Sequence, residues 1–279
     1  MRFSIITPSF RTSAFLKLCI ASVADQQVEA EHIVQDSCSD DGTLDWLTTD
    51  RRVRAFVEKD TGMYDAVNRG LRRSSGELLA YLNCDEQYLP GTLAAVADFF
   101  DAHPRVDVVF GGCLVVDAAG AFICYRKALL PSKYHIMVAH LPIFTCATFF
   151  RRSLLDKRAL FFDPKWRDLG DTEWVLRLLA AGVPMAVMPR FTSTFADTGN
   201  NMNLSPNARR EKQVMFDSAP GWARRLKFAL VCQHRLRRLL GGMYSQKPFD
   251  YAIYTPDSPS NRQTHHVAAP TFLWKSRLH

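Results

Sequence analysis

Two adjacent carboxylates, Asp85 and Glu86, follow directly after an apolar stretch at residues 78–82. Burying two unpaired acids costs free energy, so such a pair needs either solvent or a cation beside it. Carboxylate oxygens are the ligands that Mg²⁺ and Mn²⁺ prefer, and these cations keep positions open for phosphate and water. The two residues therefore predict either a solvated strand end or a divalent cation site.

Polar side chains also follow three other apolar stretches. Residues 7–9 read Thr-Pro-Ser, Asp36 ends the stretch EHIVQD, and residues 60–62 read Asp-Thr-Gly. Ligands of open parallel sheets bind beyond the carboxyl ends of the strands, so we expect these groups to lie together at that side of the sheet. Their convergence favours a ligand over solvent as the partner of Asp85.

The elements that would position these groups alternate along the first half of the chain. We expect strands at 3–7, 31–36, 53–58 and 78–82, and helices at 14–25, 42–49, 63–74 and 91–102. Repeated βαβ units predict an α/β fold with a mostly parallel central sheet, flanked by helices.

The second half has a different pattern. We expect a strand at 106–111, a hairpin of 113–116 with 122–126, a buried apolar segment at 141–150, a helix at 172–181 and a strand at 183–188. Two more helices are expected at 205–218 and 221–241. The residues after 243 are rich in Pro, Ser and Asn and are expected to be irregular.

The composition limits the class of protein. The chain has 279 residues, 47% of them hydrophobic, and a net charge of +7, which favours anionic partners such as nucleotides or phospholipid surfaces. Seven scattered cysteines without a CxxC motif indicate reduced thiols and a cytoplasmic location. No signal peptide and no apolar stretch of about 18 residues is evident. His135 and His140 have no further metal-binding group at ligand spacing, so we assign them no role.

Five blocks of sequence occur in a fixed order: SIITPSF, VQDSCSDDGT, EKDTGMYDAVNRG, GELLAYLNCDEQYLPG and DLGDTEWVLRLLAAG. Together they resemble glycosyltransferase family 2, in the branch that makes bacterial polysaccharides and cell-surface glycans. The resemblance implies the GT-A fold. It divides the chain into a catalytic domain at 1–200 (donor half to about 112, acceptor half from 113), C-terminal helices at 201–243 and a tail at 244–279.

The resemblance also implies an activity. Such enzymes move a sugar from a nucleotide-diphosphate sugar to a hydroxyl of a glycan or lipid-linked acceptor, with inversion at the anomeric carbon. A UDP-sugar is the first expectation for the donor, with GDP- and dTDP-sugars as alternatives. Asp85 and Glu86 would hold Mn²⁺ or Mg²⁺. Asn83 stands where the family's metal-binding motif usually has its first Asp.

Other site residues follow from the same resemblance. Asp36 would contact the base or ribose, whereas Asp41 is placed to cap the helix after it. For Asp65, helix capping and ligand contact are equally supported. The full set expected to bind the nucleotide sugar is Thr7, Pro8, Ser9, Asp36, Gly62, Asp65, Asn68, Asn83, Cys84 and Asp85.

Asp171 matches the family's general base, which deprotonates the acceptor hydroxyl. Gly170 stands where a first acid is often found, and capping of the following helix is the alternative role for Asp171. Glu173, Trp174 and Thr148 are expected on the acceptor side, although a Trp at a helix start more often belongs to the core. The stretch Thr198-Gly199-Asn200-Asn201 is expected to approach the diphosphate.

Residues 222–240 carry six arginine or lysine residues, no acid and an apolar side. This basic helix either lies on an anionic membrane surface or packs on the domain with a solvated basic face. The altered acid motif leaves a second function open, a catalytically weak module that binds a nucleotide sugar or glycan. Nucleic acid is not expected as a partner, because no recognised binding motif occurs. The absence of GxGxxG argues against a dehydrogenase.

Overall fold

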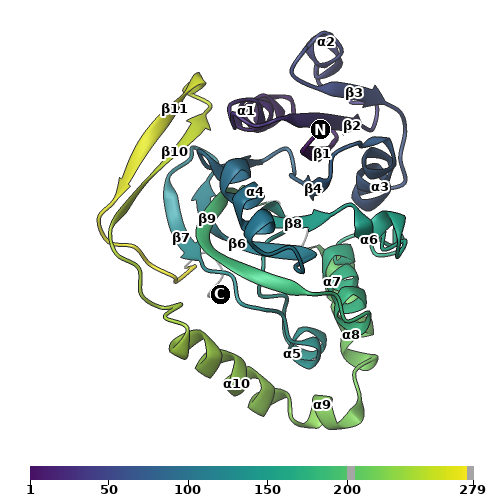
Figure 1. Cartoon of the computed structure of the whole chain (residues 1–279), viewed down its shortest axis with the longest axis vertical. Helices are drawn as coiled ribbons and strands as arrows, with labels where there is room; N and C mark the ends of the chain where they lie inside the picture. The colour runs from purple at the N-terminus through teal and green to yellow at the C-terminus, as the bar shows by residue number, and fades with distance from the viewer. Residues whose placement is uncertain (200–204, 275–279) are drawn as a thin grey trace.

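The fold is built around one nine-stranded sheet with the strand order β3-β2-β1-β4-β8-β6-β9-β5 and with β7 paired to β6. The computed structural model describes residues 1–199 and 205–274. Figure 1 shows the N-terminal strands at one end of the molecule and the helices α9 and α10 at the other. The strands are β1 Phe3–Ser9, β2 Ala30–Asp36, β3 Arg54–Val57, β4 Leu78–Tyr81, β5 Glu86–Tyr88, β6 Val108–Asp117, β7 Phe122–Arg126, β8 Thr148–Arg151 and β9 Met185–Asp197.

The N-terminal half is parallel, as the alternating pattern predicted. β1 pairs with β2 and β4, and β2 with β3, all in parallel, and the register sets Ser9 opposite Asp36. The second half mixes directions, because β8 is antiparallel to β4 and β6 whereas β9 is parallel to β6. Helices α1 Ser13–Ala24, α2 Leu44–Leu47, α3 Met63–Arg73 and α4 Thr92–Ala102 connect or flank the strands of the N-terminal half.

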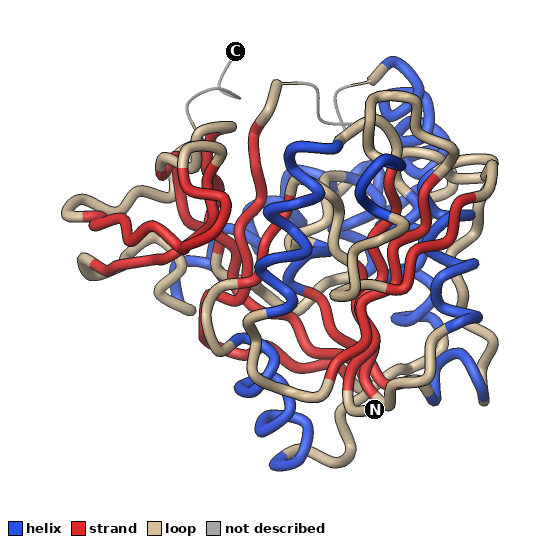
Figure 2. Tube along the Cα trace, turned by 90° about the horizontal axis from the view of Figure 1, so that it is seen from above, coloured by secondary structure: helices blue, strands red, loops and turns tan. Residues whose placement is uncertain are grey.

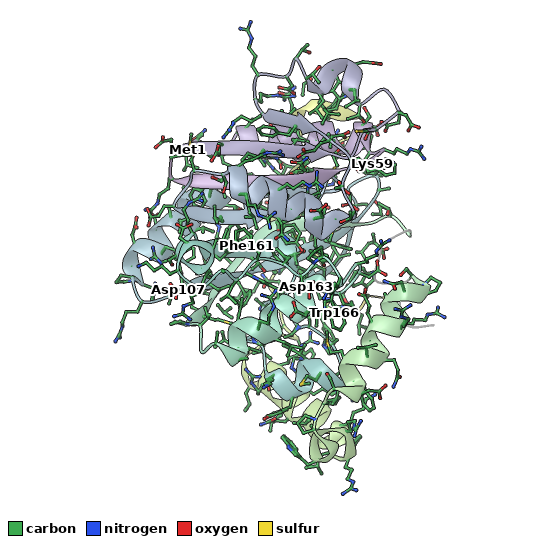
Figure 3. The ribbon with its side chains drawn as sticks, turned by 90° about the vertical axis from the view of Figure 1, so that its right-hand side faces the viewer. Met1, Lys59, Asp107, Phe161, Asp163 and Trp166 are labelled. Carbon is green, nitrogen blue, oxygen red and sulfur yellow. The ribbon has the colours of Figure 1, made fainter. Side chains whose placement is uncertain are left out.

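The amino and carboxyl ends of the parallel strands lie on opposite sides of the molecule. Figure 2 shows the strands crossing the middle of the molecule between helices. In Figure 3, Met1 and Asp107, which precede β1 and β6, lie on one side, and Lys59, which follows β3, lies on the other. The strand-end residues singled out above therefore belong to the side marked by Lys59.

Close packing fixes α3 against the sheet. A Cβ on Gly70 would lie 2.5 Å from Cγ2 of Ile6, so only glycine lets the helix approach β1 this closely. Val67 and Leu71 of the same helix are buried in one core cluster with Ile6. This contact sets the N-terminus of α3 beside the carboxyl ends of β1 and β4.

The helices of the second half are α5 Lys133–Val138, α6 Ser153–Asp156, α7 Gly170–Ala180, α8 Pro206–Asp217, α9 Gly221–Arg225 and α10 Lys227–Leu240, with a 3-10 turn η1 at Thr145–Ala147. The single helix expected at 221–241 is divided at Leu226, and α5 was not predicted. No helix in the described residues has both the length and the apolar character needed to cross a membrane.

The expectation of an irregular tail is wrong. β10 Phe249–Thr255 and β11 Ser258–Val267 form an antiparallel hairpin. Tyr251 and Ile253 alternate with more exposed neighbours and are buried against the sheet, the pattern of a strand with one buried face. The bidentate pair of Arg262 with Asp25 joins the hairpin to the end of α1.

Candidate active site

A cavity of about 1680 Å³ opens at the carboxyl ends of the strands and extends to α8 and α10. Its volume exceeds the usual size of a single small-molecule site, so it has room for two ligands. The structure brings eight of the sequence-predicted residues to its wall: Pro8, Ser9, Gly62, Asn83, Cys84, Asp85, Glu86 and Asp171.

The acid pair lies in the tight turn that joins β4 to β5. The Glu86 amide donates to the Asn83 carbonyl at 3.1 Å, and Glu86 Oε2 accepts from the Asn83 amide at 2.7 Å. Oδ1 of Asn83 is buried without a hydrogen-bond partner. Within the described parts of the chain, no Lys, Arg or His forms an ion pair with Asp85 or Glu86.

Burial is the main cause that raises the pKa of both carboxyls, and for Glu86 the neighbouring Cys146 and Asp85 raise the pKa further. Two desolvated carboxylates and an unpartnered amide oxygen thus lie within four consecutive residues, and no basic side chain of the described residues pairs with the acids. This donor set fits Mn²⁺ or Mg²⁺. It does not fit a solvated strand end, because Glu86 is only 1% exposed.

Asp171 lies at the start of α7, on the wall of the same cavity. One carboxylate oxygen accepts from the Thr172 amide at 2.6 Å and from its hydroxyl at 3.2 Å. Burial raises the pKa of Asp171, and the bonds from Thr172 and Tyr64 oppose that shift. Burial and then the negative charges of Asp171 and Glu86 raise the pKa of Tyr81, so this buried phenol is close to both acids.

The structure explains why no second acid precedes Asp171. A Cβ on Gly170 would lie 2.6 Å from two ring carbons of Tyr64. Real Cβ contacts do not come this close, so any side chain at position 170 would require the ring to move. The Tyr64 ring packed against the start of α7 therefore accounts for glycine at position 170.

Four residues expected to bind the nucleotide sugar do not line this cavity: Thr7, Asp36, Asp65 and Asn68. Asp36 is fully buried and accepts from the Ser9 hydroxyl at 2.8 Å and from the Ser39 amide at 2.7 Å. Thr7 is buried with its hydroxyl 2.8 Å from Nε2 of His32. Both side chains therefore hold the ends of β1 and β2 together rather than lining the cavity.

Asp65 and Asn68 also have structural partners. Asp65 lies in the first turn of α3, whose N-cap is Gly62; it accepts from the Thr61 amide at 3.0 Å and pairs with Arg69. Asn68 donates to the carbonyl of Phe162 at 2.7 Å and accepts from the amide of Phe162 at 3.0 Å. Asp41, expected to be structural, accepts from the amide of Ser13 at the start of α1 and from the amide of Thr43, the N-cap of α2.

The three residues expected on the acceptor side do not line this cavity, but Thr148 and Trp174 line a small neighbouring one that also borders Tyr81 and Asp171. Trp174 is 2% exposed, its indole N–H donates to the Leu160 carbonyl, and its ring stacks on Phe162. Glu173 pairs with Arg177 four residues later on α7, and Thr148 is buried with its hydroxyl on a backbone carbonyl. These contacts give the three side chains structural partners, although Oε2 of Glu173 is buried without one, and their acceptor role stays a prediction.

The far end of the cavity is cationic, which the sequence alone did not indicate. Because these residues come from three separate segments, only the fold reveals that they share one wall. They are Arg126, Lys127, Arg209, Lys212, Lys227 and Arg238. Thr198 also lines the cavity, whereas Asn200 and Asn201 lie outside the described residues.

The cavity and sheet place the chain among the GT-A proteins. Residues 1–349 of S. aureus TarS in complex with UDP align over 86% of this chain and 72% of that one, with a TM-score of 0.59 and 19% identity. The mannosyltransferase PcManGT from Pyrobaculum calidifontis in complex with GDP-Man and Mn²⁺ aligns over 86% and 78%, with a TM-score of 0.55 and 17% identity. These likenesses confirm the GT-A fold.

Sequence comparison gives the family. The family model described as "Glycosyl transferase family 2" matches residues 4–157, so this chain belongs to that family. A PGL/p-HBAD biosynthesis glycosyltransferase of Mycobacterium bovis is 36% identical over 120 residues, 40% of this chain and 47% of the relative. A putative teichuronic acid biosynthesis glycosyltransferase of Bacillus subtilis is 32% identical over 102 residues, 34% of this chain and 40% of the relative. The chain thus matches less than half the length of these curated relatives.

Proposed function

We propose that this protein is an inverting glycosyltransferase that moves a sugar from a nucleotide-diphosphate sugar to an acceptor hydroxyl. One observation supports the proposal: the acid pair and Asp171 come from separate elements and line one cavity, as does Tyr81. A displacement at the anomeric carbon needs positive charge on the leaving diphosphate and a base on the opposite side. The cavity has carboxylates suited to both tasks.

Asp85 and Glu86 would hold the divalent cation through their carboxylate oxygens, with Asn83 Oδ1 as a further oxygen donor. When bound, Mn²⁺ or Mg²⁺ neutralises the charge that grows on the leaving diphosphate. Pro8, Ser9 and Gly62 form the neighbouring wall and would border the nucleotide. UDP remains the first expectation for the nucleotide of the donor. UDP and GDP-Man are the ligands named for the two aligned structures.

Asp171 would accept the proton of the acceptor hydroxyl as the new bond to the anomeric carbon forms and the bond to the diphosphate breaks. Its desolvated carboxylate has a raised pKa, which makes it a stronger base than a solvated Asp. Thr172 and Tyr64 hold one orientation of the carboxylate by hydrogen bonds. No covalent intermediate is needed, because one displacement inverts the centre.

The acceptor is proposed to be a glycan carried on an anionic lipid. The cationic end of the cavity suits phosphate, and α10 beside it presents exposed apolar residues next to its basic ones. Phe228 is 80% exposed, Leu239 62% and Leu240 79%, whereas Leu230 faces inward and packs against Ala219 and Ala223. An outward apolar side on a basic helix favours a membrane surface over a purely solvated face.

The experiment is a comparison of donor binding and turnover in the wild type and Asp171→Asn. Binding of UDP with Mn²⁺ would be measured by calorimetry, and release of UDP from UDP-sugars would be measured with lipid-linked acceptors. We expect unchanged binding and a loss of turnover of roughly a hundredfold or more. Normal turnover in Asp171→Asn would remove this residue as the base. Binding without turnover in the wild type would favour a nucleotide-sugar-binding module.

Membrane attachment is tested separately with vesicles. The wild type should sediment with vesicles of anionic phosphatidylglycerol and not with phosphatidylcholine, and Phe228→Ser/Leu239→Ser should lose this binding. The exposed Val214→Ser on α8 is a matched control. Equal sedimentation of the double variant and the wild type would exclude the outward side of α10 as the contact.

A further inference from the structure

Three histidines from separate parts of the chain meet where α10 packs on the body of the protein. His135 is on α5, His140 follows that helix, and His234 is on α10. One ring nitrogen from each lies within 4.8 Å of the others. Figure 1 shows α5 beside α10, and the two helices are in contact. The fold thus supplies the third histidine that was not apparent near His135 and His140 in the sequence.

The buried rings have no partners. Both nitrogens of His135 and both nitrogens of His234 are buried without a hydrogen bond, although the two side chains are only 2% and 4% exposed. Buried polar atoms in native proteins are nearly always paired, so two adjacent unpaired imidazoles point to a ligand. His140 is exposed and lines the cavity together with His234.

We propose that His135, His140 and His234 bind one Zn²⁺ or a chemically similar transition-metal ion. Neutral imidazole is the form that binds such ions, and burial favours the neutral form of the two inner rings. Three nitrogens leave one position of a tetrahedral site open toward the cavity. This site is distinct from the oxygen donors at Asp85 and Glu86, which suit harder cations.

The geometry requires a modest rearrangement of the rings. His135 and His234 are stacked with centroids 3.9 Å apart, and the ring of His140 stands at 80° and 88° to them. Metal–nitrogen bonds of about 2.0–2.1 Å would bring the nitrogens to roughly 3.3 Å from one another. Side-chain rotation that opens the stack achieves this. Arg237 and Arg238 nearby oppose a cation, so the nitrogen–metal bonds must supply the affinity.

The consequence is a metal clamp between α5 and α10. The ion would hold the inward side of α10 to the body while its outward side remains exposed. This role does not depend on glycosyl transfer, so the two proposals can fail independently. The metal alone is therefore the appropriate probe.

The test is titration of the metal-free, untagged full chain with Co²⁺, followed by its visible absorption, and with Zn²⁺, followed by melting temperature. We expect one equivalent to bind and to raise the melting temperature. His140→Ala removes an exposed ligand and should fold normally but bind at least 10-fold more weakly, the loss seen even for outer-shell partners of metal ligands. His103→Ala, outside the cluster, should bind as the wild type does, and Asp85→Asn is measured to separate this uptake from any cation binding at the acid pair.

Three results would overturn the proposal. The first is the absence of stoichiometric Co²⁺ uptake by the wild type. The second is unchanged uptake in both His140→Ala and His135→Gln/His234→Gln. Loss of uptake in Asp85→Asn with retention in His140→Ala would place the metal at the acid pair and would equally reject the three-histidine site.

Discussion

Replacing Glu86 by Gln should raise the free energy of unfolding when no ligand is bound. With Mn²⁺ and UDP bound, the variant should be less stable than the wild type. The carboxylate is 1% exposed and has no cation beside it, so its ionised form opposes folding. Gln is isosteric, and its amide oxygen can still accept from the Asn83 amide. The substitution thus removes the charge and keeps the turn.

The size of the effect has an upper bound. A carboxyl with an ordinary pKa of 4.5 can always avoid ionisation by taking up a proton, at 1.36 kcal/mol per pH unit. At pH 7 the penalty therefore cannot exceed about 3.4 kcal/mol. We expect about 1–3 kcal/mol, the usual cost of an unsatisfied buried group. For a chain of this size each kcal/mol changes the melting temperature by roughly 2–4 °C.

The pH dependence follows from the direction of the shift. The folded-state pKa of Glu86 is raised, so the stability associated with the protonated acid is fully present below about pH 4.5 and is lost as pH rises through the folded pKa. The advantage of Glu86→Gln should therefore be small near pH 4.5 and grow toward pH 7. Asp98→Asn, at an exposed carboxylate on α4, should show no such trend.

Ligand reverses the order of stability. The assay is thermal unfolding with and without Mn²⁺ and UDP. At a hundredfold excess over Kd the wild type gains about 2.7 kcal/mol. The variant lacks one metal ligand and should gain much less. The reasoning is refuted if Glu86→Gln is less stable than the wild type without ligand, or if both proteins gain equally from it.

Three further predictions concern the surroundings of the site. Gly170→Asp should lower the melting temperature because its Cβ meets the Tyr64 ring, and Tyr64→Ala should relieve part of that loss in the double variant. Asn68→Ala should lower the free energy of unfolding by roughly 2–3 kcal/mol in denaturant titrations, since it unpairs a buried N–H and carbonyl of Phe162. The rate of transfer should fall as pH is lowered through the raised pKa of Asp171, and the acid limb should lie above pH 3.8 in a pH–rate profile. An acid limb at or below that value, an unperturbed Gly170→Asp or a neutral Asn68→Ala would each contradict its own argument.

Local patterns in the sequence were sufficient to predict the parallel half of the sheet and to place the acids Asp85 and Glu86 after one of its strands. Local pattern placed Asp85 after a strand and Asp171 at the start of a helix, whereas their roles follow from the family resemblance and stay predictions. Trp174 was ambiguous, because only tertiary packing decides whether an aromatic ring at a helix start faces a ligand or the core.

The remaining features depend on contacts between distant segments. His135 and His234 are 99 positions apart by their residue numbers, and no spacing rule joins them. The pair of Arg262 with Asp25 joins the C-terminal hairpin to α1 across the whole chain. The hairpin itself was not predicted, because the Pro, Ser and Asn content of this region outweighed the alternating buried residues of β10. Such sites become visible only when the fold brings the side chains together.

The most direct test of the central claim is calorimetric titration of UDP, GDP and dTDP into the wild type and Asp85→Ala, each with and without Mn²⁺. The cavity chemistry predicts that one diphosphate binds the wild type only when Mn²⁺ is present, and that Asp85→Ala does not bind it under either condition. Binding of the same affinity without the metal, or undiminished binding by Asp85→Ala, would contradict the assignment of the acid pair as the cation site.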